Sequence, residues 1–386
     1  MNSALLAAVL LCAGAARAAQ NPGSTGAPIL QLPLGSRALG MGTAFTAVAS
    51  DVSALFYNPA GLSRLNAHEA AFTYISGLAD NAVQHLAYGG PLPFTGLTGS
   101  GYSSLGASVL MSQNGTIEVN RTNADGSLAS SENISAGGDF VGTLGYAERV
   151  GMTPLDLGEG KTYGVNHFLG VSGKYVRSTL VQTYTAQTFA ADFGYLVNSP
   201  EAGVTFGLAA LNVGGKLRYV EAGDPLPTTL RAGAAYQQGI SSEHAMTFAA
   251  DSEYLVNEQQ LRINSGMEYF WQRTYGLRVG YQFLQDNSGL TMGFGLRWHG
   301  RLMLDYAWAM SRNLNDSHRF TLTYRFGGVA PSVRARNRQP FIERAPEHEP
   351  IENLDEQTPQ TYEPAPRPRA TPRPEQRTQG VPGWIY

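Results

Sequence analysis

The sequence is poor in cysteine and in charged residues. Its 386 residues include one cysteine, Cys12, only 15% carry a charged side chain, and the formal net charge is −3. Because a disulfide or a thiolate zinc site needs more than one cysteine, neither is expected. A basic surface for nucleic acid is not expected either, because the net charge is slightly negative.

Long apolar runs are confined to the N-terminus. Residues 4–16 form an apolar run of signal-peptide length, and Ala16-Arg17-Ala18 is a small-residue cleavage site. We therefore expect residues 1–18 to be a signal peptide, although no Lys or Arg precedes the run; a buried N-terminal helix is the alternative. Beyond it no run of 18 apolar residues predicts a transmembrane helix, which leaves a soluble protein or a β-barrel.

Motifs for catalysis are also missing from the sequence. The 7 histidines lack the spacing of zinc ligands, and there is no nucleophile elbow, P-loop or dinucleotide fingerprint. "GGDF" (Gly137–Phe140) lies in a predicted strand and matches a cyclase motif only by its letters. We expect no enzymatic activity, no cofactor and no metal; a lipase or protease built on a barrel is the alternative.

What the sequence does contain is a long region of strict alternation. In "TYGLRVGYQFL", Tyr275, Leu277 and Val279 fall on one face of an extended chain, and Arg278 and Gln282 fall on the other. The period of two residues predicts strands, and lengths of about 9 to 13 residues suffice to cross a bilayer when the strand is tilted. Fourteen strands are predicted, over residues 69–78, 81–91, 102–112, 134–149, 166–180, 187–198, 203–215, 228–239, 244–256, 260–272, 274–284, 289–299, 301–311 and 318–327.

The two faces of these strands differ in chemistry. One is apolar and aromatic, and the other is rich in glycine with charges of both signs, which suits a polar lumen inside a ring of lipid. Because a sheet in lipid must leave no edge unpaired, it has to close. We predict an all-β fold, a transmembrane antiparallel β-barrel of about 14 strands over residues 66–328; a soluble β-sandwich or propeller is the alternative. The charged residues predicted to face the lumen are Arg231, Asp251, Glu253, Arg262, Glu268, Arg278, Arg297, Asp305, Arg319 and Arg325.

Loop lengths predict the topology. If both termini are periplasmic, the extracellular connections include residues 113–133 and 214–228, and the connections at the other end should be short. Two of these, residues 89–101 and 150–166, are longer than turns. They fit the predicted topology less well.

The composition changes after residue 329. Residues 330–386 hold eleven of the 21 prolines, together with balanced Arg and acidic residues. Such a segment cannot bury a core, so we predict a disordered periplasmic tail over residues 329–386. The tail ends on the apolar group Trp384, Ile385 and Tyr386, which is either a docking peptide for a periplasmic partner or part of an idle tail.

A glycine- and alanine-rich segment, residues 19–65, precedes the first predicted strand. A barrel of about 14 strands is too wide for its own side chains to fill, so we predict that residues 30–63 occupy the lumen, on its periplasmic side, as a hatch. A surface loop with a short helix is the alternative. Six residues carry the prediction: Gly40 and Gly42 for close packing, Arg37 and Asp51 for ion pairs with the wall, and Asn58 and Pro59 for the turn before the strand. We expect Arg37 to meet Glu253, Glu268 or Asp305, and the Asn58 side chain to bind backbone near the first strand.

The same segment, "GSRALGMGTAFTAVASDVSALFYNPAGLSRL", resembles the N-terminal signature of the PorV/PorQ family of outer-membrane proteins. The family pattern is G-A-R-A-x-G-M-G-x-A-x-x-A-x-x-D-D-x-x-A-x-x-x-N-P-A-G-L, and Ser50 stands where the first Asp is usual. The signature covers under a tenth of the chain, and the tail has no counterpart in it. The matching residues are Arg37, Ala38, Gly40, Met41, Gly42, Ala44, Ala47, Asp51, Ala54, Asn58, Pro59, Ala60, Gly61 and Leu62.

The resemblance implies a fold similar to the FadL-type fatty-acid channels, in which an N-terminal hatch lies inside a fourteen-strand barrel of the bacterial outer membrane. It implies contact with membrane lipid and a hatch-gated channel for small hydrophobic molecules. Two alternatives stay open. One is a PorV-like component of type IX secretion that binds a secreted protein, and the other is a structural barrel that docks a periplasmic partner through its tail.

Overall fold

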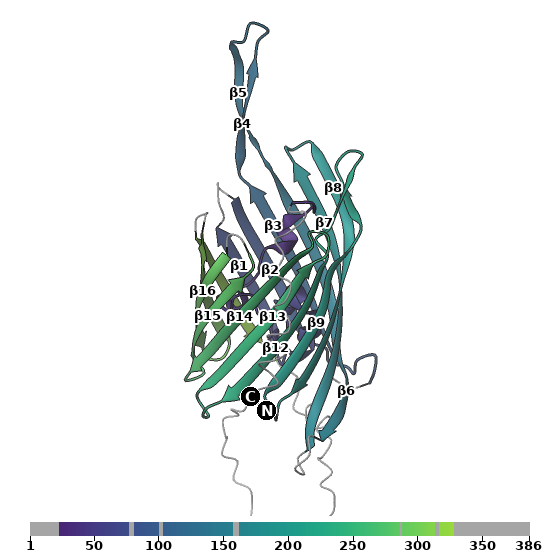
Figure 1. Ribbon diagram of the computed structural model, residues 1–386, viewed down its shortest axis with the longest axis vertical. Coiled ribbons are helices and arrows are strands. Elements are labelled where there is room, and N and C mark those ends of the chain that lie inside the picture. The colour runs from purple at the N-terminus through teal and green to yellow at the C-terminus, as the bar shows by residue number, and fades with distance from the viewer. Residues whose placement is uncertain are drawn as a thin grey trace, which may run out of the picture. The chain divides into compact units, whose positions relative to one another are not determined.

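The alternating segments of the sequence form strands, and fourteen of these strands close into one antiparallel barrel (Figure 1). This computed structural model describes residues 23–76, 81–99, 103–156, 162–285, 288–312 and 316–327. Each barrel strand pairs with its neighbours along the chain, and β1 closes the ring by pairing with β18. The predicted fold class is therefore confirmed. The barrel strands are β1 (His68–Ser76), β2 (Asn81–Pro91), β3 (Ser103–Asn114), β6 (Gly137–Asp156), β7 (Thr162–Leu180), β8 (Tyr184–Ser199), β9 (Val204–Gly214), β12 (Thr229–Gly239), β13 (Ala245–Leu255), β14 (Gln260–Trp271), β15 (Tyr275–Phe283), β16 (Ser288–Trp298), β17 (Leu302–Ser311) and β18 (Ser317–Phe326).

The register of the closing pair defines the two ends of the barrel. His68, the first residue of β1, lies opposite Phe326, the last residue of β18, and Ser76 lies opposite His318. We call the end with His68 and Phe326 the terminal end. We call the opposite end, where β1 leads to β2 and β3 leads to β6, the hairpin end.

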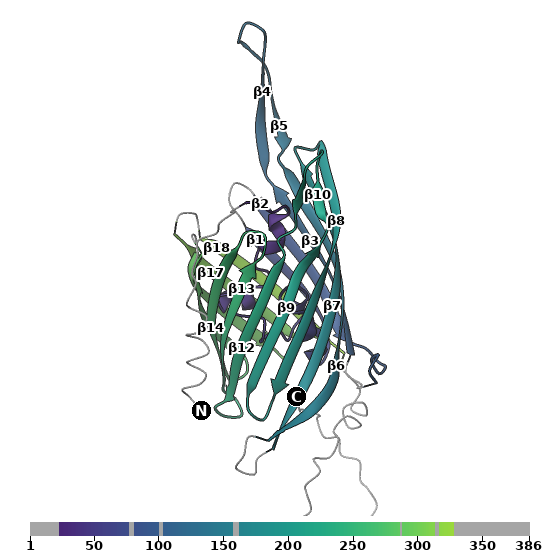
Figure 2. The ribbon, with the colours of Figure 1, turned by 45° about the vertical axis from the view of Figure 1, so that its right-hand side comes forward.

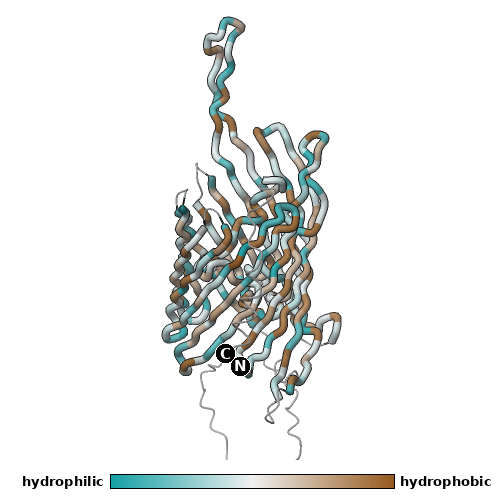
Figure 3. Tube along the Cα trace, viewed as in Figure 1, coloured by the Kyte–Doolittle hydropathy of each residue, from teal (hydrophilic) through white to brown (hydrophobic). Residues whose placement is uncertain are grey.

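The wall separates apolar from polar side chains. In β15, Leu277 is 51% exposed on the outside, whereas Arg278 is 4% exposed on the inside. In β18, Phe320 is 52% exposed and the neighbouring Arg319 is 4% exposed. Figure 3 shows this alternation of hydropathy along the strands. A closed sheet with an apolar outer face and charges inside is a transmembrane barrel.

Helices contribute little to this architecture. Within the described ranges, no helix has both the length and the apolar character needed to cross a membrane.

Two small hairpins do not belong to the barrel sheet. The connection from β3 to β6, expected as a loop over residues 113–133, is the hairpin of β4 (Thr116–Thr122) and β5 (Leu128–Ser135), which projects beyond the barrel (Figures 1 and 2). Its turn includes Asp125 and Gly126, and Gly126 has a φ of 85°, a conformation that favours glycine. The connection from β9 to β12 contains the smaller pair β10 (Lys216–Arg218) and β11 (Gly223–Pro225).

The two connections that are too long for turns have a structural explanation. β6 continues to Asp156 and β7 begins at Thr162, so most of residues 150–166 is strand. A register shift between Arg149 and Gly151 interrupts the alternation there, which is why the sequence pattern ended β6 too early. After β2, the chain folds back onto the wall, where the backbone N–H of Leu97 donates to Tyr146 Oη at 3.2 Å.

The segment before β1 lies inside the ring of strands, as Figures 1 and 2 show from two directions. It contains only short helices, because glycine and proline recur along it. We call its described part, residues 23–65, the hatch. The helices of the hatch are η2 (Pro28–Gln31), α2 (Ser36–Gly40), α3 (Ala54–Tyr57) and η3 (Pro59–Arg64).

A charge placed on the outward face of the barrel should reduce its stability. Phe294 lies in the middle of β16 and is 43% exposed on the outside. Phe294→Arg should reduce the free energy of unfolding by about 2–4 kcal/mol, because arginine is costly at the bilayer midplane. Urea unfolding in lipid vesicles measures this change, and Phe294→Leu is the matched control. Equal stability of the two variants would mean that this face does not meet lipid.

Candidate functional site

The hatch runs along the lumen and reaches both ends. At the hairpin end, Ile29, Leu30 and Leu34 pack in one apolar cluster with wall residues such as Ile75 and Val176. At the other end, η3 lies against β3, β6, β7 and β8. The expectation that the hatch occupies only the periplasmic side is therefore wrong. The reason is that the first residues of the hatch are apolar and find an apolar inner wall at the hairpin end.

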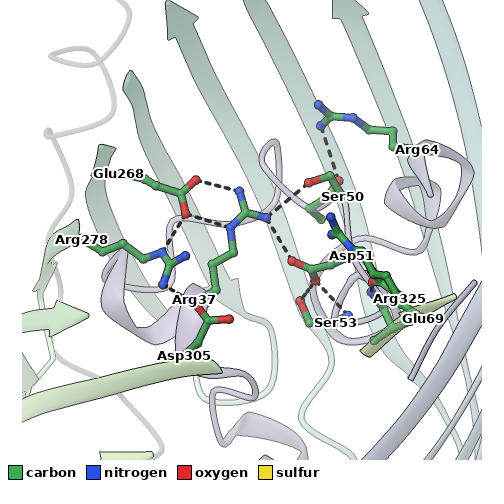
Figure 4. Close-up of polar contacts among 12 residues, drawn as sticks. Arg37, Ser50, Asp51, Ser53, Arg64, Glu69, Glu268, Arg278, Asp305 and Arg325 are labelled. Atoms are coloured by element: carbon green, nitrogen blue, oxygen red, sulfur yellow. Dashed lines mark hydrogen bonds and ion pairs between the residues drawn. The ribbon is translucent and has the colours of Figure 1, made fainter. Parts of the chain in front are cut away.

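Arg37 is the main polar link between the hatch and the wall. Its guanidinium binds Glu268 of β14 in a bidentate arrangement, with Nε–Oε1 at 2.9 Å and Nη2–Oε2 at 2.8 Å (Figure 4). Nη1 also donates to Asp51 Oδ2 at 3.0 Å and to Ser50 Oγ at 3.3 Å. The fork geometry of arginine suits this double contact with a carboxylate.

The wall supplies a second cation to the same carboxylate. Arg278 of β15 donates to Glu268 Oε1 at 2.7 Å and to Asp305 Oδ1 at 2.6 Å. Of the three carboxylates expected for Arg37, Glu268 is thus the partner, and Asp305 is reached only through Arg278. Because Glu268 is 1% exposed, the two guanidinium groups replace the water that its charge would otherwise require.

Asp251 of β13 forms a second anchor that the sequence pattern did not identify. Its Oδ2 accepts from the backbone N–H groups of Phe45 and Thr46, both at 2.8 Å, and from Thr46 Oγ1 at 2.6 Å. Arg231 of β12 adds contacts to Asp251 at 3.3 Å and to the carbonyl oxygen of Thr43 at 2.8 Å. Periodicity placed Asp251 and Arg231 in the lumen, but backbone donors of the hatch leave no signal in a sequence.

Three more of the charged residues predicted to face the lumen, Glu253, Arg262 and Arg297, also have partners in the wall. Arg231 and Arg262 both approach Glu253, at 3.3 and 3.9 Å. Arg297 lies over the Phe270 ring, with Cζ 4.0 Å from the ring centre.

The glycines of the hatch lie against glycines of the wall. Gly42 has a φ of +64°, and its N–H donates to Thr291 Oγ1 at 3.0 Å. A Cβ on Gly42 would lie 2.5 Å from the carbonyl oxygen of Ser265, and one on Gly40 would lie 3.0 Å from the Cα of Gly293. Side chains larger than hydrogen would therefore push the hatch off the wall.

Asp51 and Val52 lie where the hatch contacts β1 and β18, the two strands that close the barrel. Asp51 Oδ1 accepts from the N–H of Ser53 at 3.1 Å, and the Ser53 hydroxyl also donates to it. The N–H of Val52 donates to Glu69 of β1, which pairs with Arg325 of β18 at 2.8 Å. The hatch is thus bound to the strand pair that closes the ring.

Asn58 organises the turn that leads to η3. Its Oδ1 accepts from the N–H of Ala60 at 3.1 Å, and its Nδ2 donates to the carbonyl oxygens of Thr46 and Tyr195 at 3.0 and 3.2 Å. The side chain binds backbone as expected, but the backbone belongs to the hatch and β8 rather than to the first strand. Pro59 follows as the first residue of η3, where proline fits because its missing N–H has no helical partner.

Two cavities flank the hatch and share no lining residue. The hairpin-end cavity has a volume of about 340 Å³ and lies between η2, α3 and the strands β1, β9, β12–β15, β17 and β18. The terminal-end cavity has a volume of about 260 Å³ and lies between η3 and parts of β2, β3, β6, β7 and β8. The hatch separates the two ends of the lumen.

Two arginines at these cavities have no carboxylate partner among the described residues. In the hairpin-end cavity, Arg319 donates to the carbonyl oxygen of Pro33 and to Ser317 Oγ. In the terminal-end cavity, Arg64 Nη1 reaches the carbonyl oxygens of Ala47 and Ala49 at 3.3 and 3.5 Å. Burial, together with the positive charge of Arg37, lowers the pKa of Arg64 to about 10.

Several predicted features remain outside this description. Trp384, Ile385 and Tyr386, the expected signal peptide and the tail all lie outside the described residues. Within the described ranges, no group of three His, Cys, Asp or Glu side chains is placed to hold a metal ion.

Comparisons with known proteins identify a family and similar barrels. The model of the uncharacterised protein family UPF0164 matches residues 3–261, and no curated protein matches the sequence. The Ralstonia pickettii toluene transporter TbuX is 11% identical, with a TM-score of 0.43 over 76% of this chain and 98% of that one. The Pseudomonas putida toluene transporter TodX is 11% identical, with a TM-score of 0.44 over 80% and 98%. A Pseudomonas aeruginosa FadL homologue is 9% identical, with a TM-score of 0.37 over 77% and 99%. The resemblance to the PorV/PorQ family stays a prediction.

The shared carboxylate predicts unequal effects of two substitutions on the hatch. Glu268→Gln should strongly weaken the attachment of the hatch to the wall, since breaking a buried ion pair costs about 3–5 kcal/mol. Asp51→Asn should weaken it less, because Arg37 keeps its bidentate contact with Glu268.

The reporter for this comparison is a cysteine at Ser36, which is fully buried in α2. Ser36→Cys is nearly isosteric, and the chain without residues 1–18 has no other thiol. The rate of maleimide labelling should rise more with Glu268→Gln than with Asp51→Asn. Equal rates in the two variants would show that Glu268 does not hold the hatch.

Proposed function

We propose that the chain, which belongs to the UPF0164 family, is an outer-membrane barrel that passes small hydrophobic molecules through a lumen gated by the hatch. The observation that carries the proposal is the hairpin-end cavity between the hatch and the wall. A gated channel needs a gate and a binding site. In this barrel the hatch blocks the lumen, and a partly apolar cavity lies beside it.

The lining of the hairpin-end cavity suits a small apolar ligand. Leu30, Leu32 and Leu39 of the hatch and Ile75 of β1 supply apolar surface. A volume of about 340 Å³ lies within the range of about 300–1,000 Å³ of small-molecule sites, which are mostly apolar with a few polar groups. Arg319 supplies such a polar group, so a ligand with a carboxylate or hydroxyl could be oriented there.

The gate in this proposal is the hatch itself. Its backbone packs directly on wall glycines, its Arg37 is paired with Glu268, and its backbone N–H groups at Phe45 and Thr46 donate to Asp251. Water can replace these polar contacts one at a time, whereas a shift of the hatch also exposes part of the apolar cluster around Ile29, Leu30 and Leu34, so the resting position is favoured in the absence of a ligand. A ligand that binds the shifted hatch more tightly than the resting one would open the path.

We infer the orientation in the membrane from the lengths of the connections. The hairpin end carries β4–β5 and β10–β11, whereas β14 and β15, and likewise β16 and β17, are joined at the terminal end by only three residues. Outer-membrane barrels have short periplasmic turns and longer extracellular loops. We therefore place the hairpin end outside the cell and both termini in the periplasm, which opens the hairpin-end cavity to the exterior.

A second candidate function is favoured by the β4–β5 hairpin. It projects beyond the barrel (Figure 2), and nearly all its side chains are exposed. Its free strand edges could pair with an extended segment of another protein, as a secretion component that binds cargo would require. Replacing residues 116–135 by a short turn separates the two functions: cargo binding should be lost, whereas uptake of a small molecule should persist.

Filling the cavity tests the channel directly. Ala309 lies on the inner face of β17 and lines the hairpin-end cavity. Ala309→Trp should weaken binding of the apolar fluorescent probe N-phenyl-1-naphthylamine by about tenfold or more, since the ring would occupy the space. Fluorescence titration of the purified barrel measures this, with the outward Leu304→Phe as the matched control. Unchanged binding in Ala309→Trp would overturn the cavity as the ligand site.

Removing the hatch tests the gate. Deletion of residues 20–63 should leave a barrel that still folds, because the closed ring of paired strands includes no segment of the hatch. The deletion should conduct small ions in a planar bilayer, whereas the full chain should conduct few. If the deletion variant conducts as few ions as the full chain, the hatch does not block the lumen.

A further inference from the structure

The terminal-end cavity has a donor-rich lining that the proposed channel does not use. It lies on the far side of the hatch from the hairpin-end cavity and has a volume of about 260 Å³. Among the residues that line it are two arginines, Arg64 and Arg149, and three asparagines, Asn66, Asn166 and Asn198. No Asp or Glu occurs among the described residues that line it.

Arg64 carries a positive charge that forms no ion pair with a carboxylate of the described residues. In the part of the chain that the structure describes, its guanidinium hydrogen-bonds to the carbonyl oxygens of Ala47 and Ala49, at 3.3 and 3.5 Å. Figure 4 shows the difference from Arg37, which lies between two carboxylates. A partly buried guanidinium without a carboxylate gains most from an anion, because ionic hydrogen bonds are about twice as strong as neutral ones.

The neighbouring groups can complete an anion site. Arg149 Nη1 donates to Asn166 Oδ1 at 3.3 Å, which holds the second guanidinium at the wall of the cavity. The cavity is several times the volume of about 30 Å³ that a liquid water occupies, so a hydrated phosphate or carboxylate group fits.

We propose that the terminal-end cavity binds an oxyanion, the phosphate or carboxylate group of a ligand, on the guanidinium of Arg64 with Arg149 as the second cation. Two sources present this chemistry: a free ion, or the headgroup of an anionic lipid. The site is independent of the channel proposal, because it lies on the other side of the hatch and takes a charged group rather than an apolar one.

Calorimetry on the full-length protein in dodecyl maltoside tests the proposal. Inorganic phosphate, acetate and the short-chain lipid dihexanoyl phosphatidic acid are titrated separately. At least one of the three should bind, and Arg64→Gln should weaken its binding by about tenfold or more, as expected for loss of a charged hydrogen bond. Arg149→Gln should act in the same direction, which keeps the test valid if Arg64→Gln does not fold.

Arg301→Gln is the matched control, because Arg301 is an exposed arginine in a turn at the same end of the barrel. It should leave the affinity unchanged. Tighter binding of the lipid than of phosphate would identify a headgroup site, and equal binding would identify a site for the free ion. Absence of binding by all three probes, or equal affinities of the wild-type protein and both cavity variants, would overturn the proposal.

Discussion

The carboxylate of Glu268, shared between Arg37 of the hatch and Arg278 of the wall, is the interaction on which the closed lumen depends. An almost completely buried carboxylate is stable only if cations and donors replace its water, and here each guanidinium lies within 3 Å of it. Arg37 also joins Asp51, and Arg278 joins Asp305, so one chain of charges crosses from the hatch to β17. A barrel of this width can be filled by a polar segment because the wall offers charges that match it.

The hatch meets two kinds of wall. At the hairpin ends of β1–β3 and β6–β8 the inner face has an apolar patch, where Ile29, Leu30 and Leu34 pack with residues such as Val141. Farther along β7 and β8 the same face carries the buried ion pair of Lys174 and Asp192. Against β12–β18 the inner face carries most of the buried charges, and α2 lies on β15–β18. Burial of apolar surface favours the resting position of the hatch without directional contacts, whereas the ion pairs and close glycine contacts fix its register. Close contacts with wall glycines occur on both sides of the hatch, for example at Gly170 of β7 and Gly293 of β16, whereas most of the ion pairs lie on the β12–β18 side.

The cavities follow from this division. Where the hatch leaves the apolar patch near η2, the space between it and strands including β12–β15 stays unfilled and becomes the hairpin-end cavity. At the other end η3 contacts β6–β8, and Arg64 projects into the terminal-end cavity. The lumen thus holds an amphipathic space at one end and a cationic, hydrogen-bonding space at the other, with the hatch between them.

The sequence by itself determined the strands, their faces and the presence of a lumenal segment. Alternation is a local property, so Leu277 and Arg278 are assigned to opposite faces from their neighbours alone, and the mixed charges of the inner face imply a closed barrel. The alternation failed where β6 bulges near Gly151 and where β4–β5 forms a hairpin outside the membrane. The partners of the hatch were decided only by the tertiary structure. Arg37 and Glu268 are 231 positions apart, and the register around the whole ring, rather than any local pattern, selects Glu268 over Glu253 and Asp305. The same holds for Asp251, whose hydrogen bonds go to backbone N–H groups, because every residue except proline offers such a donor and only the folded chain brings them within reach.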